Sequence, residues 1–112
     1  MTNDQHRYPL LQEALPELAD EVATLLAQDE ELDLAEQVPL LRLIDRCRCG
    51  DYFCATVYTA ARPKGAWGPS HENITLDPSE GMIILDVVDR KITCIEVLDR
   101  KDIRERLLRV LP

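Results

Sequence analysis

Apolar side chains in the first quarter of the chain recur every three or four residues. Between residues 10 and 28 this spacing predicts an amphipathic helix with one buried stripe. Pro16 cannot continue a helix from Leu15, because its ring clashes with the preceding turn. We therefore expect a break near Leu15 and a second helix that begins at Pro16. Residues 29–37 predict a short acidic helix or a loop that ends at Pro39. The stripe consists of Leu11, Leu15, Leu18, Val22, Leu25 and Leu26.

From residue 40 the period of the apolar positions changes to two, which is typical of strands. Residues 40–48 and 53–60 predict a hairpin around Gly50, and residues 73–76 predict a short strand. Residues 82–88 and 92–98 predict another hairpin, whose three-residue turn pairs Val88 with Ile92. In that register the core face carries Ile83, Leu85, Val87, Thr93, Ile95 and Val97. The opposite face carries Asp86, Cys94 and Glu96 together with Met82, Ile84, Ile92 and Leu98.

The last residues, 99–112, predict a helix with Asp99 as its N-cap. Its buried stripe is Ile103, Leu107, Val110 and Leu111. The order of helices, five strands and a helix predicts one α+β domain over residues 1–112. It has an acidic helical segment at 1–39, a largely antiparallel sheet of hairpins at 40–98 with helices on one face, and a C-terminal helix at 99–112.

Residues 81–99, GMIILDVVDRKITCIEVLD, carry the one family resemblance in the chain. They resemble the closing hairpin of small bacterial domains of unknown function that follow the pattern G-apolar-I-x-D … I-x-G-I-E-I-L-D. Cys94 stands where that pattern has Gly. The resemblance implies a sheet-forming bacterial domain and transfers no functional residue.

Charge is distributed unevenly along the chain. Residues 1–39 carry ten acids and one base, whereas residues 40–112 carry eleven acids and twelve bases. Acidic helices of this kind are solvated, dock against arginines of the same chain, or bind a basic partner protein. The absence of clustered cations argues against nucleic-acid binding. No apolar run reaches the length of a membrane span and no signal-peptide pattern opens the chain, so we expect no membrane partner and a cytoplasmic location.

The segment CRCGDYFC, residues 47–54, holds three of the four cysteines. Thiols stay reduced in the cytosol, so disulfides are not expected. The thiols are either small buried side chains of the core, a redox group, or ligands of a zinc ion. In the zinc alternative Cys47, Cys49 and Cys54 bind the ion, and His71, Cys94, an acid or water completes the set.

The register of the hairpin distinguishes these alternatives. A three-residue loop pairs Cys49 with Phe53 and points Cys54 to the other face. A four-residue loop pairs Cys49 with Cys54 and gathers the three thiols on one face, but it places Arg46 beside Val57. The apolar pattern favours the three-residue loop and therefore structural thiols. A bulge at Gly50 would reverse that conclusion, since it shifts the register by one residue.

The loop RPKGAWGPSHE, residues 62–72, contains the single tryptophan between glycines and prolines. It either presents Trp67 to a partner, with Arg62 and Lys64 as basic neighbours, or folds down so that Trp67 covers the outer face of the sheet.

Catalytic patterns are sparse in this chain. No phosphate-binding loop or nucleophile elbow is present. Asp86 and Glu96 form a diagonal pair on neighbouring strands that could share a proton or bind a cation. An enzyme would need a pocket that unites His71 with an acid, and without one we expect no catalysis.

The function expected from these patterns is non-catalytic binding of another protein, and a basic protein is the partner that suits the acidic helices. Glu17 and Glu21 on the acidic helices, or Trp67, Arg62 and Lys64, form the expected contact surface, as in an immunity or antitoxin-like protein. The alternative is a zinc-binding protein that uses CRCGDYFC. A homodimer through an edge strand is also compatible with the sequence.

Overall fold

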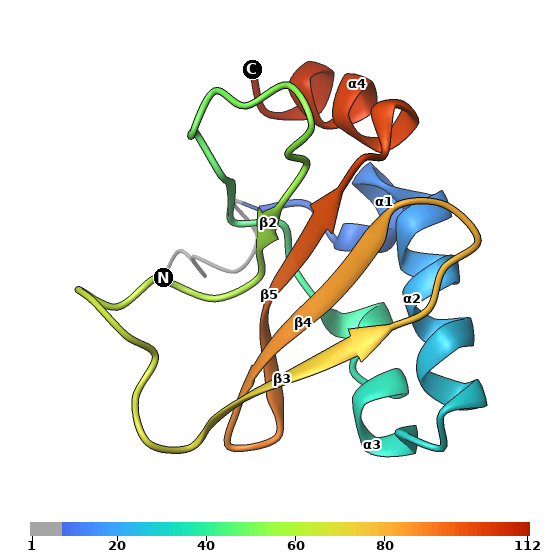
Figure 1. Cartoon of the computed structure of the whole chain (residues 1–112), viewed down its shortest axis with the longest axis vertical. Helices are drawn as coiled ribbons and strands as arrows, with labels where there is room; N and C mark the ends of the chain where they lie inside the picture. The colour runs from blue at the N-terminus through green and yellow to red at the C-terminus, as the bar shows by residue number, and fades with distance from the viewer. Residues whose placement is uncertain (1–7) are drawn as a thin grey trace, which may run out of the picture.

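A computed structural model describes residues 8–112 (Figure 1). Three short or medium helices come first, a five-stranded sheet follows, and a helix closes the chain, so the predicted α+β class is confirmed. The helices are α1 (Leu11–Ala14), α2 (Pro16–Gln28), α3 (Leu32–Ala35), the short 3-10 helix η2 (Val38–Leu40) and α4 (Lys101–Val110). The strands are β1 (Asp45–Arg46), β2 (Val57–Tyr58), β3 (His71–Leu76), β4 (Met82–Val88) and β5 (Lys91–Leu98).

The break predicted at Pro16 is present. Helix α1 ends at Ala14, Leu15 leaves the helical region with φ −133° and ψ 67°, and Pro16 opens α2 at a position where no N–H is required. Helix α2 buries Leu18, Ala19, Val22 and Leu26. These side chains belong to one core cluster that also contains the inward side chains of β4 and β5.

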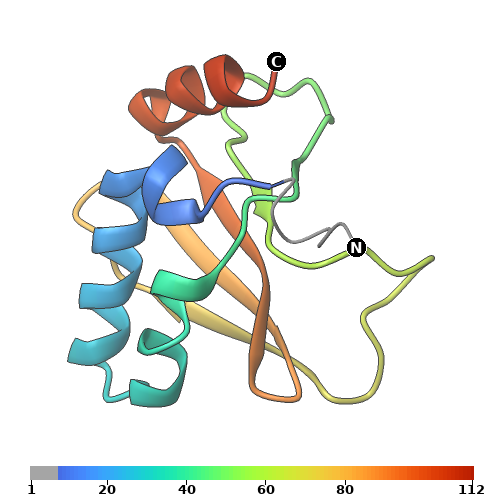
Figure 2. The ribbon, with the colours of Figure 1, turned by 180° about the vertical axis from the view of Figure 1, so that it is seen from behind.

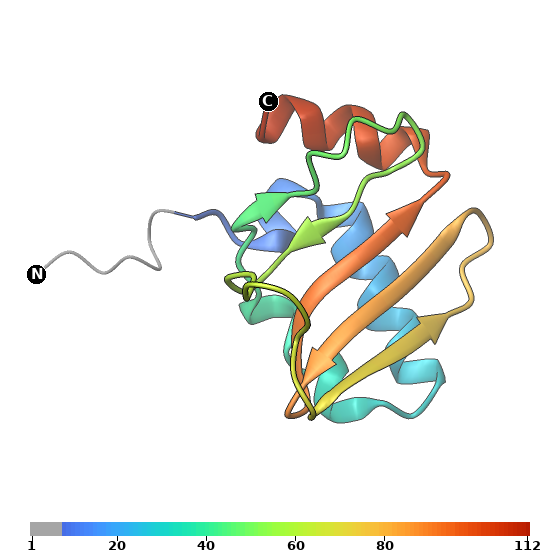
Figure 3. The ribbon, with the colours of Figure 1, turned by 60° about the vertical axis from the view of Figure 1, so that its left-hand side comes forward.

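The sheet is antiparallel throughout, with strand order β1-β2-β5-β4-β3. Helices α1, α2 and α3 cover one face, as the view from behind shows (Figure 2). Figure 3 shows the sheet in front of these helices, with α4 across its end beside the β1–β2 connection. Within residues 8–112, the outer face therefore carries no helix. None of the helices within residues 8–112 has the length and apolar character needed to cross a membrane.

In the half of the β4–β5 hairpin farther from the turn, the predicted pairing is confirmed, and Leu85 pairs with Ile95. The predicted three-residue turn is wrong. Val88 pairs with Lys91, and Asp89 and Arg90 form a two-residue turn with φ of 52° and 61°, the mirror-image type that suits a twisted hairpin. A bulge between Asp86 and Val87 reconciles the two registers. Because of it, Ile92 lies opposite Val87 and is buried, contrary to its predicted place on the outer face.

The β1–β2 hairpin has the register that was not favoured. Asp45 pairs with Tyr58 and Arg46 with Val57, which is the pairing of the four-residue loop. The expected conflict at Arg46 does not arise, since its Nε donates to the carbonyl oxygen of Leu111 at 2.5 Å, just beyond the end of α4. A helix C-terminus favours a cation. The ladder is also only two residue pairs long, much shorter than the predicted strands 40–48 and 53–60.

The predicted N-cap of the last helix is wrong as well. Asp99 has φ 58°, and Arg100 precedes the first turn of α4 without a side-chain capping bond. Ile103 and Leu107 are buried as predicted. The side chain of Arg100 is only 9% exposed and contacts Glu21 of α2 at 2.8 Å. The acidic N-terminal helices thus dock in part against an arginine of the same chain.

Gly81 offers a test of the packing between the start of β4 and the end of β5. A Cβ at this position would overlap the carbonyl oxygen of Leu98 and lie 2.9 Å from Cγ of Arg100, and φ is +68°. Gly65 also has positive φ, +91°, but open space around it. We expect Gly65→Ala to lower the free energy of unfolding by about 1 kcal/mol, from backbone strain alone. Gly81→Ala should lower it by roughly 2–4 kcal/mol, because a steric clash is added. Urea denaturation of both variants measures the difference, and equal losses would contradict this account.

Candidate functional site

Three thiols meet at the tip of the β1–β2 connection. The sulfur atoms of Cys47, Cys49 and Cys54 all lie within 4.8 Å of one another. Cys47 and Cys54 are half-buried and Cys49 is exposed. Thiolates about 2.3 Å from a shared metal ion lie roughly 4 Å from each other. The spacing of the three sulfurs therefore suits a single bound ion without rearrangement of the backbone.

The hairpin register produces this cluster. The N–H of Cys47 donates to the carbonyl oxygen of Thr56 at 2.9 Å, which continues the pairing of Asp45 with Tyr58. Side chains alternate along strands, so positions 47 and 49 lie on the same face as positions 54, 56 and 58. Gly50, with φ 83°, reverses the chain between them, and the N–H of Cys54 donates to the carbonyl oxygen of Asp51 at 3.1 Å.

The thiols differ in how readily they ionise. Burial opposes ionisation of Cys54, but hydrogen bonds from Thr56 and from the other two thiols hold its pKa below the usual value. A backbone hydrogen bond from Asp51 favours the thiolate of Cys49. Its hydrogen bonds with Cys47 and Cys54, together with some desolvation, outweigh that effect and raise the pKa of Cys49 to about 11. Of Cys49 and Cys54, Cys54 is therefore the thiol that ionises more readily.

His71 does not complete this cluster. Its Nε2 lies 2.7 Å from Oδ1 of Asp86, and it belongs to β3, which is separated from β2 by β5 and β4. Within residues 8–112 no His, Cys, Asp or Glu joins the three cysteines to form a four-ligand group. The sequence-based proposal of His71 as fourth ligand is therefore not supported by the geometry.

The outer face of the sheet contains a depression of about 380 Å³ that begins at the thiols. Cys47 and Cys54 of the thiol cluster line it, and so do Asp86, Cys94 and Glu96. The pairing of Tyr58 with Cys94, and of Cys94 with Asp86, places these side chains in one row across three strands. The cysteine cluster and the acidic pair therefore belong to one continuous surface.

Asp86 is the most buried acid of this surface, with 6% of the residue exposed. His71 Nε2 and Asn73 Nδ2 both donate to its Oδ1, at 2.7 and 2.8 Å. Glu96 lies diagonally across the strands, as the sequence predicted. Burial, a hydrogen bond with Asp86 and the charge of Asp86 raise the pKa of Glu96 to about 7, partly offset by His71. The protonated form of Glu96 is therefore favoured beside the buried Asp86.

His71 contacts Asp86 but does not line the depression, whereas the fourth cysteine, Cys94, does line it. Cys94 is buried, and desolvation together with the charge of Asp86 raises its pKa far above the usual value. A nucleophilic cysteine needs the opposite shift, because the thiolate is the reactive form. The arrangement of Cys94, His71 and Asp86 therefore lacks the activation that thiol catalysis requires.

The tryptophan loop folds down onto the outer face. Trp67 is half-buried, lines the depression and lies against the ring of His71, with 6.4 Å between ring centroids. The guanidinium of Arg62 stacks 4.6 Å above the ring of Tyr58, and Lys64 is exposed. Of the two alternatives for this loop, the structure has the one in which Trp67 covers the outer face of the sheet. This cover explains why Asp86 and Cys94 are buried although no helix of residues 8–112 packs on that face.

The two acids expected to contact a partner differ in their surroundings. Glu17 is exposed on α2, whereas Glu21 is bound by Arg100. Arg90 likewise binds Glu31, Asp33 and Glu72 at 2.5–2.9 Å. Arginines of the same chain therefore neutralise part of the acidic surface.

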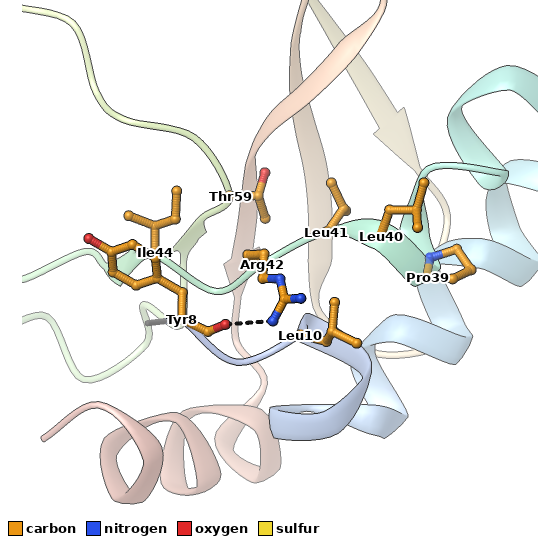
Figure 4. Close-up of a pocket in the computed structure, with 8 residues that line it drawn as sticks. All are labelled: Tyr8, Leu10, Pro39, Leu40, Leu41, Arg42, Ile44 and Thr59. Atoms are coloured by element: carbon orange, nitrogen blue, oxygen red, sulfur yellow. Dashed lines mark hydrogen bonds between the residues drawn. The ribbon is translucent and has the colours of Figure 1, made fainter. Parts of the chain in front are cut away.

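A second cavity, of about 690 Å³, lies beside the short strand β1 (Figure 4). Its walls are largely apolar side chains, and Arg42 donates from Nη1 to the carbonyl oxygen of Tyr8 at 2.9 Å. The residues around it are Tyr8, Leu10, Pro39, Leu40, Leu41, Arg42, Ile44 and Thr59. No acid, histidine or cysteine lines it, so it offers neither metal ligands nor an acid–base pair.

Comparison of the chain with protein-family models, curated proteins and solved structures found no match. The resemblance of residues 81–99 to bacterial domains stays a prediction.

Glu96 provides a test of the acidic pair. Its pKa is raised from the usual 4.5 to about 7, so its protonated form stabilises the fold below about pH 4.5 and that stabilisation is lost as pH rises through about 7. Glutamine stays uncharged at every pH and can still donate to Asp86. We expect Glu96→Gln to raise Tm relative to the wild type at pH 8 and to leave it nearly unchanged at pH 5. Glu36→Gln, at an exposed acid, is the matched control. Parallel Tm curves for wild type and Glu96→Gln would contradict the raised pKa of Glu96.

Proposed function

We propose that this protein binds a thiophilic metal ion through Cys47, Cys49 and Cys54. The observation that carries the proposal is the convergence of three sulfurs within 4.8 Å at the hairpin tip. In the sequence, the three-residue loop had favoured structural thiols. The four-residue register removes that objection, and the zinc-binding alternative becomes the basis of the proposed function.

The exposure of Cys49 also supports a ligand role. A free cysteine that serves only to pack is usually among the most buried residues of a protein. Cys94 has that character, with 3% of the residue exposed, whereas Cys49 lies exposed and Cys47 and Cys54 are half-buried. Reduced thiols require a reducing compartment, so a cytoplasmic location is part of the proposal. The ion is held rather than used for a reaction, and catalysis is not included.

Binding of a basic partner protein stays a prediction. Glu17 and the exposed acids of α2 are compatible with it, but Arg100 and Arg90 already engage Glu21 and three other acids. The partner would have to displace these ion pairs or use the acids that remain exposed.

Metal content tests the proposal directly. Reduced protein is equilibrated under nitrogen with Zn²⁺ or with Cu⁺, desalted, and analysed for metal per chain and for reactive thiols. We expect one ion per chain for at least one of the two metals, with three thiols shielded. Cys49→Ser should retain the ion much more weakly, and Cys94→Ser should retain it as the wild type does, since Cys94 lies outside the cluster. Substoichiometric metal in all samples, or equal retention by both variants, would refute the metal site.

The affinity for the ion should depend on pH. The pKa of Cys49 near 11 means that this ligand carries a proton at neutral pH, and the ion must displace it. Each released proton strengthens the apparent affinity about tenfold per pH unit. We therefore expect the apparent Kd to fall by at least that factor per unit between about pH 6 and pH 8. Competition with a chelator, corrected for the chelator's own protonation, measures this, and a constant Kd would show that Cys49 is not a ligand.

A further inference from the structure

We propose that the ion is Cu⁺, held by three thiolates in a three-coordinate site and exchanged with a thiol-bearing partner. This inference rests on the proposed function and specifies its ligand. It follows from the number of donors, from the surroundings of every other candidate donor, and from the place of the cluster in the fold.

The donor count distinguishes the two metals. A structural zinc site is almost always tetrahedral and closed by four protein ligands. Within the described part of the chain the cluster supplies three, and no further His, Cys, Asp or Glu lies within reach of all of them. Cu⁺ prefers soft thiolate ligands and is satisfied by three of them. The donor set therefore fits Cu⁺ without an additional ligand.

Three other potential metal ligands on the outer face, His71, Asp86 and Cys94, contact one another rather than the thiol cluster. His71 Nε2 is bound to Asp86, and Asp86 accepts a second hydrogen bond from Asn73. Cys94 is buried directly opposite Asp86 in the ladder. Movement of any of these groups to the thiol cluster would leave a buried carboxylate without its partners, which costs free energy. The cluster is therefore expected to stay at three ligands when it is loaded.

The position of the cluster favours exchange over permanent storage. It lies at the tip of a hairpin with an exposed turn formed by Gly50, Asp51 and Tyr52, and Cys49 itself is exposed. A three-coordinate ion at such a place can accept a sulfur atom from another molecule before it releases one of its own. A structural ion would be expected in the interior, where it could hold several elements of the fold together. Here the nearest regular structure is the ladder of β1 and β2, which is two residue pairs long.

Competition between metals, combined with X-ray absorption, tests the inference. Protein loaded with Cu⁺ under nitrogen is challenged with about a hundredfold excess of Zn²⁺. We expect copper to be retained at one ion per chain, with three sulfur scatterers at about 2.3 Å and no nitrogen or oxygen neighbour. Cys94→Ser should give the same spectrum, whereas Cys49→Ser should show two sulfurs and weaker retention against a Cu⁺ chelator.

The outcomes separate this inference from the proposed function. Displacement of Cu⁺ by Zn²⁺, or a fourth protein ligand in the copper spectrum, overturns the assignment to three-coordinate Cu⁺ and leaves a metal site in place. Failure of both metals to bind stoichiometrically refutes the metal site and this inference together. Copper retained equally by Cys49→Ser is adventitious and also overturns the inference.

Discussion

The burial of Val57 against Ile95 is the constraint on which the candidate site depends. These two residues are paired between β2 and β5, and both are fully buried on the helix-covered side of the sheet. Since side chains alternate along a strand, this pairing points positions 54, 56 and 58 to the outer face. Cys54 therefore lies outside the core whatever the first arm of the hairpin does. The register of the first arm of the hairpin then determines whether the thiols of Cys47 and Cys49 lie beside Cys54.

A contact between residues far apart in the chain stabilises the register of the first arm, residues 45–49, against β2. Arg46 lies opposite Val57, a position that apolar pattern alone assigns to an uncharged residue. The carbonyl oxygens of Leu111 and Pro112 accept hydrogen bonds from Arg46 and Arg48, and Arg48 also binds Asp45. The end of the last helix thus supplies partners for charges that would otherwise disfavour the register, and the same register gathers the thiols.

The parts of this structure that sequence predicts are those governed by local chemistry or by apolar alternation without a register shift. The break at Pro16 follows from one ring, and alternation gives the faces of β4 and β5 between the bulge and the open end of the hairpin. The β1–β2 register was missed because it depends on a hydrogen bond between residues 46 and 111. The two-residue turn of the β4–β5 hairpin was missed because Asp89 and Arg90 adopt positive φ, which non-glycine residues rarely do. The N-cap of α4 was predicted wrongly for the same reason, since Asp99 also has positive φ. The acidic pair was visible in the sequence, but its histidine was not, because β3 begins two residues before the predicted strand.

The two arms of the hairpin are held unequally, and this bears on how an ion would be captured. The second arm is fixed to the sheet, since Ala55 donates to Val97 and Asp99 donates to Phe53. The first arm is held by the ladder bond from Cys47 and by the arginine contacts with the C-terminus. Cys54 and Cys47 are accordingly held by backbone contacts, whereas Cys49 lies at the exposed end of the first arm. A ligand that binds the assembled arrangement of the three thiols stabilises it by mass action. The gain in order should therefore be concentrated in residues 47–54, while the core beneath, which is already closed by Val57 and Ile95, should change little.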